Sequence, residues 1–280
     1  MKNNKMKKIL ELVWIFIISS LFILPLLWMV SSSFKTEQQI FLDMTSWRAF
    51  FPSIESFTIK PYKELLESYN IFKNMINSGI YAIISLILNL IINSLAGYAL
   101  AKFKFPLKKI ILLFVVALTI VPTEAIILPM YLITNKLRMI NTLPGLILPF
   151  TANVMNIFLF RQYFLSFPKE LIEAGKIDGL GPLGIFFKIV LPVSKNIYAT
   201  TGVLAFLASW NDFLWPIMVI TKTEMMPIQV ALNAIFSDRE NIFTNHMMAA
   251  LTLATIPVII VYTLFQKQVV EGIATTGSKG

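Results

Sequence analysis

Acidic and amide side chains inside long apolar stretches are the groups in this sequence best suited to do chemistry. Glu124 lies in one such stretch, and Asp212 follows Trp210 and Asn211 in another. An unpaired ionisable group in a lipid bilayer costs at least about 2.5 kcal/mol, so each acid is a candidate functional residue. Carboxylates and amides hydrogen-bond hydroxyl groups and an indole face stacks on C–H surfaces, so the second cluster suits a sugar.

Each of these groups also has a structural interpretation. Glu124 either lines a route or braces a helix distorted by Pro122 and Pro129, and we favour bracing because no fixed cation stands beside it. Asp212 and its neighbours either contact a solute or clamp helices or subunits together, and we favour the clamp. Weaker candidates of the same kind are the amides in two further apolar stretches: Asn89, Asn93, Asn153 and Asn156.

The composition excludes several other kinds of chemistry. Cysteine is absent, which removes disulfides, thiolate nucleophiles and Cys-ligated zinc. The single histidine, His246, removes every motif that needs two, so we expect no metal site and no catalytic residue. Hydrophobic residues make up 56% of the 280 residues and charged residues 14%, proportions that indicate an integral membrane protein.

The elements that must position these side chains are membrane-spanning helices. A helix needs about 20 apolar residues to cross the hydrocarbon core, and its backbone groups must be satisfied internally. The sequence therefore predicts an all-α protein, a single transmembrane domain over residues 1–280. Six spans are expected at residues 12–34, 77–101, 110–134, 143–161, 197–220 and 246–266.

The distribution of Lys and Arg predicts the orientation of these spans. Fifteen of the 24 lie on the side of the N-terminus and nine on the other, so both termini are expected in the cytoplasm. An outer loop then covers residues 35–73 and an inner loop residues 161–195. Because the basic residues separate apolar blocks, the net charge of +9 indicates a membrane partner and not nucleic acid. The first span lacks a small-residue cleavage pattern, so we expect it to be retained.

The inner loop carries helix start and stop signals. Ser166-Phe167-Pro168 predicts a helix start, because serine caps free N–H groups and proline fits the first turn. Gly179 predicts its end in the left-handed conformation. Gly181-Pro182 then restarts a second short helix that ends near Pro192. The expected result is a helix-turn-helix on the cytoplasmic face.

One face of the first loop helix is nearly flat. Leu171, Ala174, Gly175 and Asp178 fall at spacings of three and four residues and share a face. Ala174 and Gly175 have almost no side chain, so another protein can approach the backbone, and Glu173 and Asp178 add negative charge beside them. A docking helix and an interfacial helix that only packs on the bundle both fit this spacing.

These residues resemble the EAA loop of ATP-binding-cassette importer permeases. The loop pattern matches at Glu173-Ala174-Gly175, Gly179, Ile189 and Leu191-Pro192, and departs at Gly175 and Asn196, where the family commonly has alanine and proline. Further segments resemble the carbohydrate branch, and its maltose-type permeases in particular. They are Ala99-Leu100-Ala101-Lys102-Phe103, Arg161-Gln162, Pro168-Lys169-Glu170-Leu171, Trp210-Asn211-Asp212-Phe213, Glu271-Gly272-Ile273-Ala274 and Gly277-Ser278-Lys279-Gly280.

The resemblance implies the ABC importer permease fold, with the first loop helix as a coupling helix that docks on a cytoplasmic ATPase. The docking residues it implies are Glu173, Ala174, Gly175, Asp178, Gly179, Leu191 and Pro192. The pathway candidates are Glu124, Asn153, Asn156, Trp210, Asn211 and Asp212. The residues after Glu271 either reach the ATPase interface or form a frayed terminus.

The implied partners are a second permease subunit in a heterodimer, two ATP-binding-cassette ATPase domains, an extracellular solute-binding protein and membrane lipid. The implied place is the bacterial cytoplasmic membrane, and the implied solute is a sugar, oligosaccharide or related polyol. The sequence has no G-x-x-x-x-G-K-[ST] loop, so this chain binds no cofactor, and ATP and Mg belong to the partner ATPase.

Two other hypotheses stay open at this stage. The first is an ion-coupled secondary transporter in which Glu124 and Asp212 carry the coupling proton. The second is a membrane scaffold without transport activity whose inner loop recruits a partner. The flat, acid-flanked loop helix argues against the secondary transporter, because a self-sufficient transporter does not need a docking helix.

Overall fold

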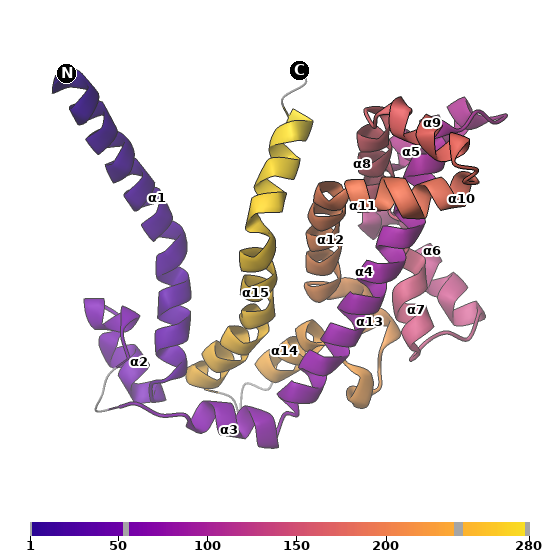
Figure 1. The fold of residues 1–280 in the computed structure, drawn as a ribbon. Helices are drawn as coiled ribbons and strands as arrows, with labels where there is room; N and C mark the ends of the chain where they lie inside the picture. Colours follow the sequence, from indigo (N-terminus) through magenta and orange to yellow (C-terminus); the bar gives the residue numbers. More distant parts are fainter. Residues whose placement is uncertain (1, 53–55, 238–242, 278–280) are drawn as a thin grey trace. The chain divides into compact units, whose positions relative to one another are not determined.

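The computed structural model describes residues 2–52, 56–237 and 243–277, and throughout these ranges the regular structure is helical (Figure 1). The all-α class expected from the sequence is confirmed. The chain divides into two compact units. Unit 1 comprises Met1–Lys73 and Ala231–Pro257, and unit 2 comprises Asn74–Val230 and Val258–Gly280.

Unit 1 begins with a long apolar helix that exposes its side chains. Helix α1 (Lys2–Ser33) is followed by three short helices, α2 (Glu37–Asp43), η1 (Trp47–Phe50) and α3 (Lys60–Glu67). The unit also holds the end of α14 (Ile228–Ser237) and the first part of α15 (Thr244–Gly277). The His246 ring of α15 contacts the Glu64 carboxylate of α3, and this hydrogen bond lowers the pKa of Glu64.

A buried ion pair organises the turn that follows α1. The Lys35 ammonium donates to the Asp43 carboxylate at 2.9 Å and to the Arg48 carbonyl at 2.7 Å. Both side chains of the pair are almost fully enclosed. The Lys35 hydrogen bond lowers the pKa of Asp43, because it stabilises the charged carboxylate. The Glu37 carboxylate accepts from the Thr244 hydroxyl and from the Asn245 backbone N–H. The Asn245 N–H lies in the first turn of α15, where backbone N–H groups have no partner within the helix.

Unit 2 starts within α4 (Ile71–Lys102) and contains the broken helices. In chain order these are α5 (Lys108–Leu118), α6 (Thr123–Lys136), α7 (Leu143–Ile147), η2 (Leu148–Phe150), α8 (Val154–Leu165), α9 (Lys169–Ile177), α10 (Pro182–Ile185), the π-helical turn η3 (Phe186–Val190), α11 (Leu191–Val193), α12 (Lys195–Trp210), α13 (Leu214–Val219) and η4 (Thr223–Met225). The remainder of α15 completes the unit.

Three helices of the described chain are long and apolar enough to cross a membrane without a break. They are Met6–Ser33, Ile71–Lys102 and Thr244–Gln268, which contain the second and sixth predicted spans and all but the last residue of the first. Three further helix pairs pass the same test but bend, by 108° between α5 and α6, 49° between η2 and α8, and 84° between α11 and α12. The number of spans reaches six when each bent pair counts as one.

The helices of the third, fourth and fifth predicted spans are interrupted, and at the third the expected distortion by proline is seen. The segment 110–134 breaks between Leu118 and Thr123, because Pro122 cannot donate a helical hydrogen bond and takes extended backbone angles. The segment 143–161 breaks before Val154. The segment 197–220 stops at Trp210 and resumes at Leu214.

Candidate functional site

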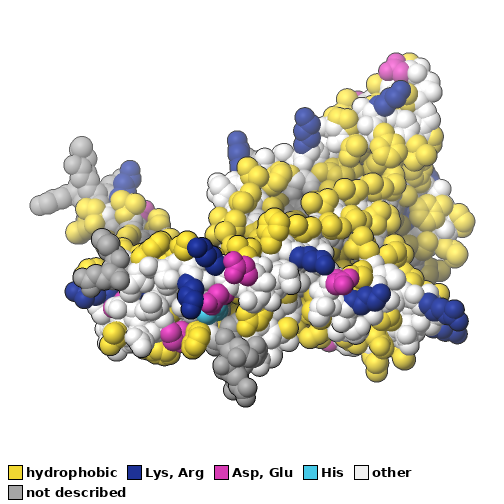
Figure 2. Space-filling model, turned by 90° about the horizontal axis from the view of Figure 1, so that it is seen from below, with side chains coloured by type: hydrophobic (Ala, Val, Ile, Leu, Met, Phe, Trp, Pro, Cys, Tyr) yellow, Lys and Arg dark blue, Asp and Glu magenta, His cyan; other side chains and the backbone are white. Residues whose placement is uncertain are grey.

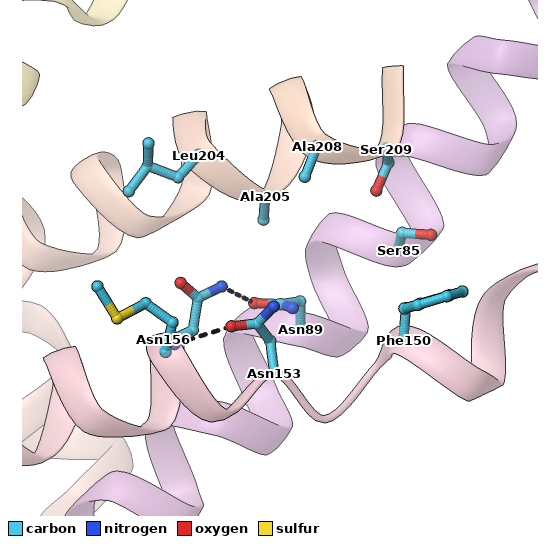
Figure 3. A pocket seen from close by; sticks show the side chains of 10 residues that line it. Ser85, Asn89, Phe150, Asn153, Asn156, Leu204, Ala205, Ala208 and Ser209 are labelled. Atoms are coloured by element: carbon cyan, nitrogen blue, oxygen red, sulfur yellow. Dashed lines mark hydrogen bonds between the residues drawn. The ribbon is translucent and has the colours of Figure 1, made fainter. Parts of the chain in front are cut away.

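Unit 2 contains a polar cavity of about 240 Å³ beside the break between η2 and α8 (Figure 3). Three helical segments supply its walls: α4, the η2–α8 break and α12. The lining residues are Ser85, Asn89, Phe150, Asn153, Met155, Asn156, Leu204, Ala205, Ala208 and Ser209. Amides and hydroxyls thus face a common space with small and apolar side chains around them.

The amides hold the helix break in place. The Asn153 side chain caps α8 by accepting from the Asn156 backbone N–H at 3.0 Å. The Asn156 side-chain amide donates to the side-chain oxygen Oδ1 of Asn89 on α4 at 2.7 Å. Asn93, one turn further along α4, accepts from the Asn153 N–H at 2.9 Å and donates to the Thr151 carbonyl at 3.1 Å. Backbone groups freed by the break therefore find partners on α4.

The lining of this cavity carries no ionisable side chain. It offers amide and hydroxyl donors and acceptors, which can hydrogen-bond the hydroxyls of an uncharged solute. Such a lining does not supply a general acid, a general base or a nucleophile. Within the described residues no group of three or more acidic or histidine side chains is placed to hold a metal ion.

Two of the six predicted pathway residues, Asn153 and Asn156, line the cavity. Glu124 lies instead in the first turn of α6, directly after the Pro122 break, with an exposed side chain. Among the described residues no hydrogen bond or ion pair to the Glu124 carboxylate is formed, so bracing within this chain is not seen. Trp210 is buried and stacks on Phe206 with the ring centroids 5.7 Å apart.

Asp212 lies outside a helix, contrary to its predicted place within the fifth span. Asn211 ends α12, and Asp212 occupies the short break before α13. The Tyr81 hydroxyl of α4 donates to the Asp212 carboxylate at 2.8 Å. The Asn211 side chain is exposed and accepts a long hydrogen bond of 3.5 Å from Gln229. Asp212 thus joins two helical segments, as the clamp interpretation expects.

The sequence analysis missed the hydroxyl residues of the cavity, Ser85 and Ser209. A signal for one of them was present, since Ser85, Asn89 and Asn93 repeat every four residues and so form a polar stripe on one face of α4. Ser209 has no comparable signal, because the residues around it on α12 are apolar or small.

The inner loop folds as two short helical segments with the predicted stop. Helix α9 ends at Ile177, and Gly179 has φ +76°, the left-handed angle that glycine adopts without strain. The predicted cap is wrong: Pro168 occupies the position before α9, and the Ser166 hydroxyl donates to the Tyr163 carbonyl at the end of α8. Ser166 is the residue that ends α8, so its hydroxyl does not cap α9.

Of the flat face predicted on the first loop helix, Gly175 points inward. Gly175 is buried, and a Cβ atom there would lie 2.5 Å from the Ile189 Cδ1 and 3.2 Å from the Ile185 Cγ1. The absence of a side chain thus lets α9 pack closely on η3, and Gly175 itself offers no surface to another protein. Glu173, Ala174, Ile177 and Asp178 are exposed on the remaining sides of α9.

An aromatic cluster lies under the loop. Its buried members come from α4, α8, the α8–α9 turn, α10, η3 and α12: Tyr98, Phe160, Phe164, Phe167, Ile185, Phe186, Val190 and Ile197. Tyr98 contacts Phe164 at 5.6 Å and Phe186 at 5.2 Å between ring centroids. The loop is therefore anchored to the ends of two membrane helices through packed rings.

The fold defined by these broken helices and the inner loop is that of a membrane transport subunit. A crystal structure of a bacterial ABC transporter involved in the import of the acidic polysaccharide alginate contains a chain of the same fold. The two chains superpose with a TM-score of 0.83 at 23% identity, over 95% of this chain and 98% of that one.

The chain belongs to the family described as binding-protein-dependent transport system inner membrane component, whose model matches residues 93–275. It is 34% identical over 209 residues to the arabinooligosaccharides transport system permease protein AraQ of Bacillus subtilis (strain 168), which covers 75% of this chain and 74% of AraQ. It is 31% identical over 251 residues to the lactose transport system permease protein LacG of Rhizobium radiobacter, 89% of each chain.

Family membership confirms the resemblance seen in the sequence. The chain is a permease subunit of a binding-protein-dependent importer, a transport component and not an enzyme. An ion-coupled transporter that uses Glu124 and Asp212 is not supported. A scaffold without transport activity does not fit a family of transport components either.

Proposed function

We propose that this subunit carries a sugar, an oligosaccharide or a related polyol into the bacterial cytoplasm, along a route that passes the polar cavity. The observation that carries the proposal is the uncharged lining, in which Ser85, Asn89, Asn153, Asn156 and Ser209 provide hydrogen-bonding groups. A polyhydroxylated solute loses its water shell on entering a membrane protein, and amides and hydroxyls replace those hydrogen bonds.

The names of the relatives support this class of solute. AraQ is named for arabinooligosaccharides and LacG for lactose, both of them sugars. Asn89 and Asn156 already bond to each other, so a solute that passes exchanges weak interactions instead of meeting one tight site. Transport requires such moderate binding, because the solute must leave as well as enter.

The inner loop is the proposed contact with the ATPase. In this proposal Glu173, Ala174 and Asp178 on the exposed side of α9 meet the ATPase, together with the turn at Gly179 and the exposed Pro192. Gly175 acts from within, because its missing side chain lets α9 pack closely on η3, and Leu191 is half-buried at the start of α11. ATP and Mg bind the two ATPase domains, and their closure moves the loop.

The further proposed partners are a second, different permease chain and an extracellular solute-binding protein. The excess of Lys and Arg on the side of the N-terminus supports a cytoplasmic position for both termini and the inner loop. The proposed contact of the last residues with the ATPase rests on side chains after Gln268, which lie outside the described residues. In this arrangement α5–α6 and α7–α8 each form one bent span, whereas the third pair joins the inner-loop residues Pro182–Val193 to α12, the first part of the fifth span.

Uptake by cells that carry the complete transporter tests the solute class. Asn89→Leu and Asn156→Leu should each lower the uptake of labelled arabinotriose or lactose at least several-fold while the protein stays in the membrane. Asn135→Leu, at an exposed site on α6, is the matched control and should leave uptake unchanged. Normal sugar uptake in both cavity variants would overturn the proposed route.

Cross-linking tests the docking face separately. The chain has no native cysteine, so Ala174→Cys provides a single reactive site. In native membranes it should capture an ATP-binding-cassette ATPase that mass spectrometry identifies. Lys63→Cys, in the outer loop, is the control and should capture none. Products confined to this chain or to lipid at Ala174→Cys would contradict the docking face.

A further inference from the structure

The turn that follows α1 exposes an apolar surface that the transport mechanism does not use. We define this outer apolar patch by its exposed residues on α2 and around η1: Phe41, Leu42, Met44, Trp47 and Phe51. Leu42 is 74% exposed and Trp47 is 71% exposed. Patches of large apolar side chains on a protein surface usually mark contact with a membrane or with another molecule.

The other side of the same segment is fixed to the rest of unit 1. Ile40 and Ala49 are buried, and the Lys35–Asp43 ion pair lies between α2 and the turn. The Lys35 ammonium also holds the Arg48 carbonyl, next to Trp47. These contacts hold the segment in one orientation relative to α1, and the rings of the patch are exposed in that orientation.

A second helix of the outer loop shows the opposite composition. The exposed residues of α3 include Lys60, Lys63 and Glu67, and Lys60 forms an ion pair with Glu64 on its surface. Apart from Leu66, which is 50% exposed, helix α3 thus presents a charged surface that suits water. The outer apolar patch belongs to the same loop and the same unit, but its surface is apolar and does not suit water.

The patch continues a surface that faces lipid. Helix α1 is a candidate span from Met6 to Ser33, and none of its most apolar stretch is buried in the chain. Three residues separate its end from α2. The η1 turn packs against α1, and Figure 1 shows α2 beside the end of α1. The patch therefore stands next to the last turns of a membrane helix, where the bilayer ends.

Figure 2 shows that hydrophobic side chains form much of the surface on the face it presents, interrupted by single Lys, Arg, Asp and Glu side chains. At the level of the headgroups, tryptophan and arginine are favoured because each combines an apolar body with a polar end. Trp47 and the exposed Arg48 are such a pair.

We propose that the outer apolar patch is an interfacial anchor, seated in the outer leaflet of the bilayer at the boundary of acyl chains and headgroups. Phe41, Leu42 and Met44 enter the acyl region, and Trp47 and Arg48 lie at the headgroups. The buried Lys35–Asp43 pair sets the angle between α1 and this anchor. The anchor is independent of the identity of the solute and of the polar cavity.

Spin labels on the reconstituted transporter test the anchor. The cysteine-free chain allows single nitroxides at Leu42→Cys and Trp47→Cys in lipid nanodiscs that hold the complete transporter. Oxygen concentrates in the acyl region and a nickel chelate stays in water. We expect an oxygen-to-nickel accessibility ratio several-fold higher at both sites than at Lys63→Cys on α3, and approaching that of Phe22→Cys on α1.

Two results would overturn the anchor. A ratio at both sites equal to that of Lys63→Cys means that the patch faces water. Low accessibility to both reagents means that protein covers it, either the second permease or the solute-binding protein. Because labels can disturb folding, a second measurement uses the native side chain: lipids brominated near the carbonyl should quench the fluorescence difference between wild type and Trp47→Phe. Absence of quenching there would also reject the anchor.

Discussion

The aromatic cluster under the inner loop and the polar cavity belong to the same unit but are stabilised in different ways. The cluster packs rings from four or more helical segments and excludes water. At the cavity a helix is interrupted and amides replace the missing backbone bonds. A loop that transmits force must not deform, whereas a route for a solute must offer polar groups that exchange partners. Packing stabilises the first region, and hydrogen bonds shape the second.

The largest expected effect is that of Gly175→Arg. A side chain at this position collides with Ile189 and Ile185, so α9 must lift from η3. Uptake should be abolished, and the melting temperature of the purified transporter should fall. Gly175→Ala should keep nearly normal uptake, since the close Ile189 atom is the tip of a flexible side chain.

Ala174→Arg separates packing from docking. Ala174 is exposed, so this change should leave the melting temperature unchanged while uptake and uptake-coupled ATP hydrolysis are lost. If Gly175→Arg instead preserves the melting temperature and loses only coupling, Gly175 contacts the ATPase directly and the packing interpretation of this glycine fails.

The next effect is that of Phe164→Ala in the aromatic cluster. Phe164 is fully buried against Tyr98 and Phe160, so its truncation should cost about 3–5 kcal/mol of stability. Unfolding in mixed micelles measures the loss. Phe114→Ala, exposed on α5, is the matched control and should cost much less. Equal losses of stability at the two positions would show that packing in the aromatic cluster does not stabilise the inner loop.

Removal of one amide should affect stability less and transport more. Asn156→Leu breaks a hydrogen bond to Asn89, and such bonds between membrane helices contribute on average about 0.6 kcal/mol. The same unfolding assay should show a small loss, while uptake falls several-fold. The double variant with Asn89→Leu should be less destabilised than the sum of the single variants. A loss as large as that of Phe164→Ala would place Asn156 in the structural core.

The smallest effect concerns acid. Lys35 lowers the pKa of Asp43, so the stabilisation from this pair is complete above the ordinary aspartate value of 3.8. It declines as the pH falls below that value and is lost below the lowered pKa of the folded state. The polar cavity has no ionisable lining, so acid should loosen the outer loop first. Hydrogen exchange between pH 6 and pH 3 should show protection lost around residues 35–48 before residues 150–156, and Asp43→Asn should remove the pH dependence.

Much of the fold could be predicted from local signals. Hydropathy located the three unbroken spans, and Gly179 marked the end of α9 because a left-handed turn is a property of one residue. The breaks at Pro122 and Asn153 were harder to place. Proline predicts a distortion but not an angle of 108°. In the sequence Asn153 is one amide within an apolar segment, and only its hydrogen bond to α4 identifies it as part of a helix break.

The candidate site was only partly predictable. Asn153 and Asn156, which line the cavity, were named from their place in an apolar segment, and so were Trp210, which stacks on Phe206, and Asp212, which accepts from Tyr81. Polarity alone does not say in which direction a side chain points. A residue's partners can lie 67 positions away, as Asn89 does from Asn156, and only packing brings them together.

By itself, the sequence determined the membrane class, the long spans, the loop with its glycine stop and the resemblance to importer permeases. These properties depend on transfer of side chains to lipid and on the backbone preferences of single residues. The tertiary structure decided that Gly175 faces inward, that four amides meet at one break, and that the turn after α1 turns its rings outward. Each of these depends on how separate segments pack against one another, which the preference of a single residue does not specify.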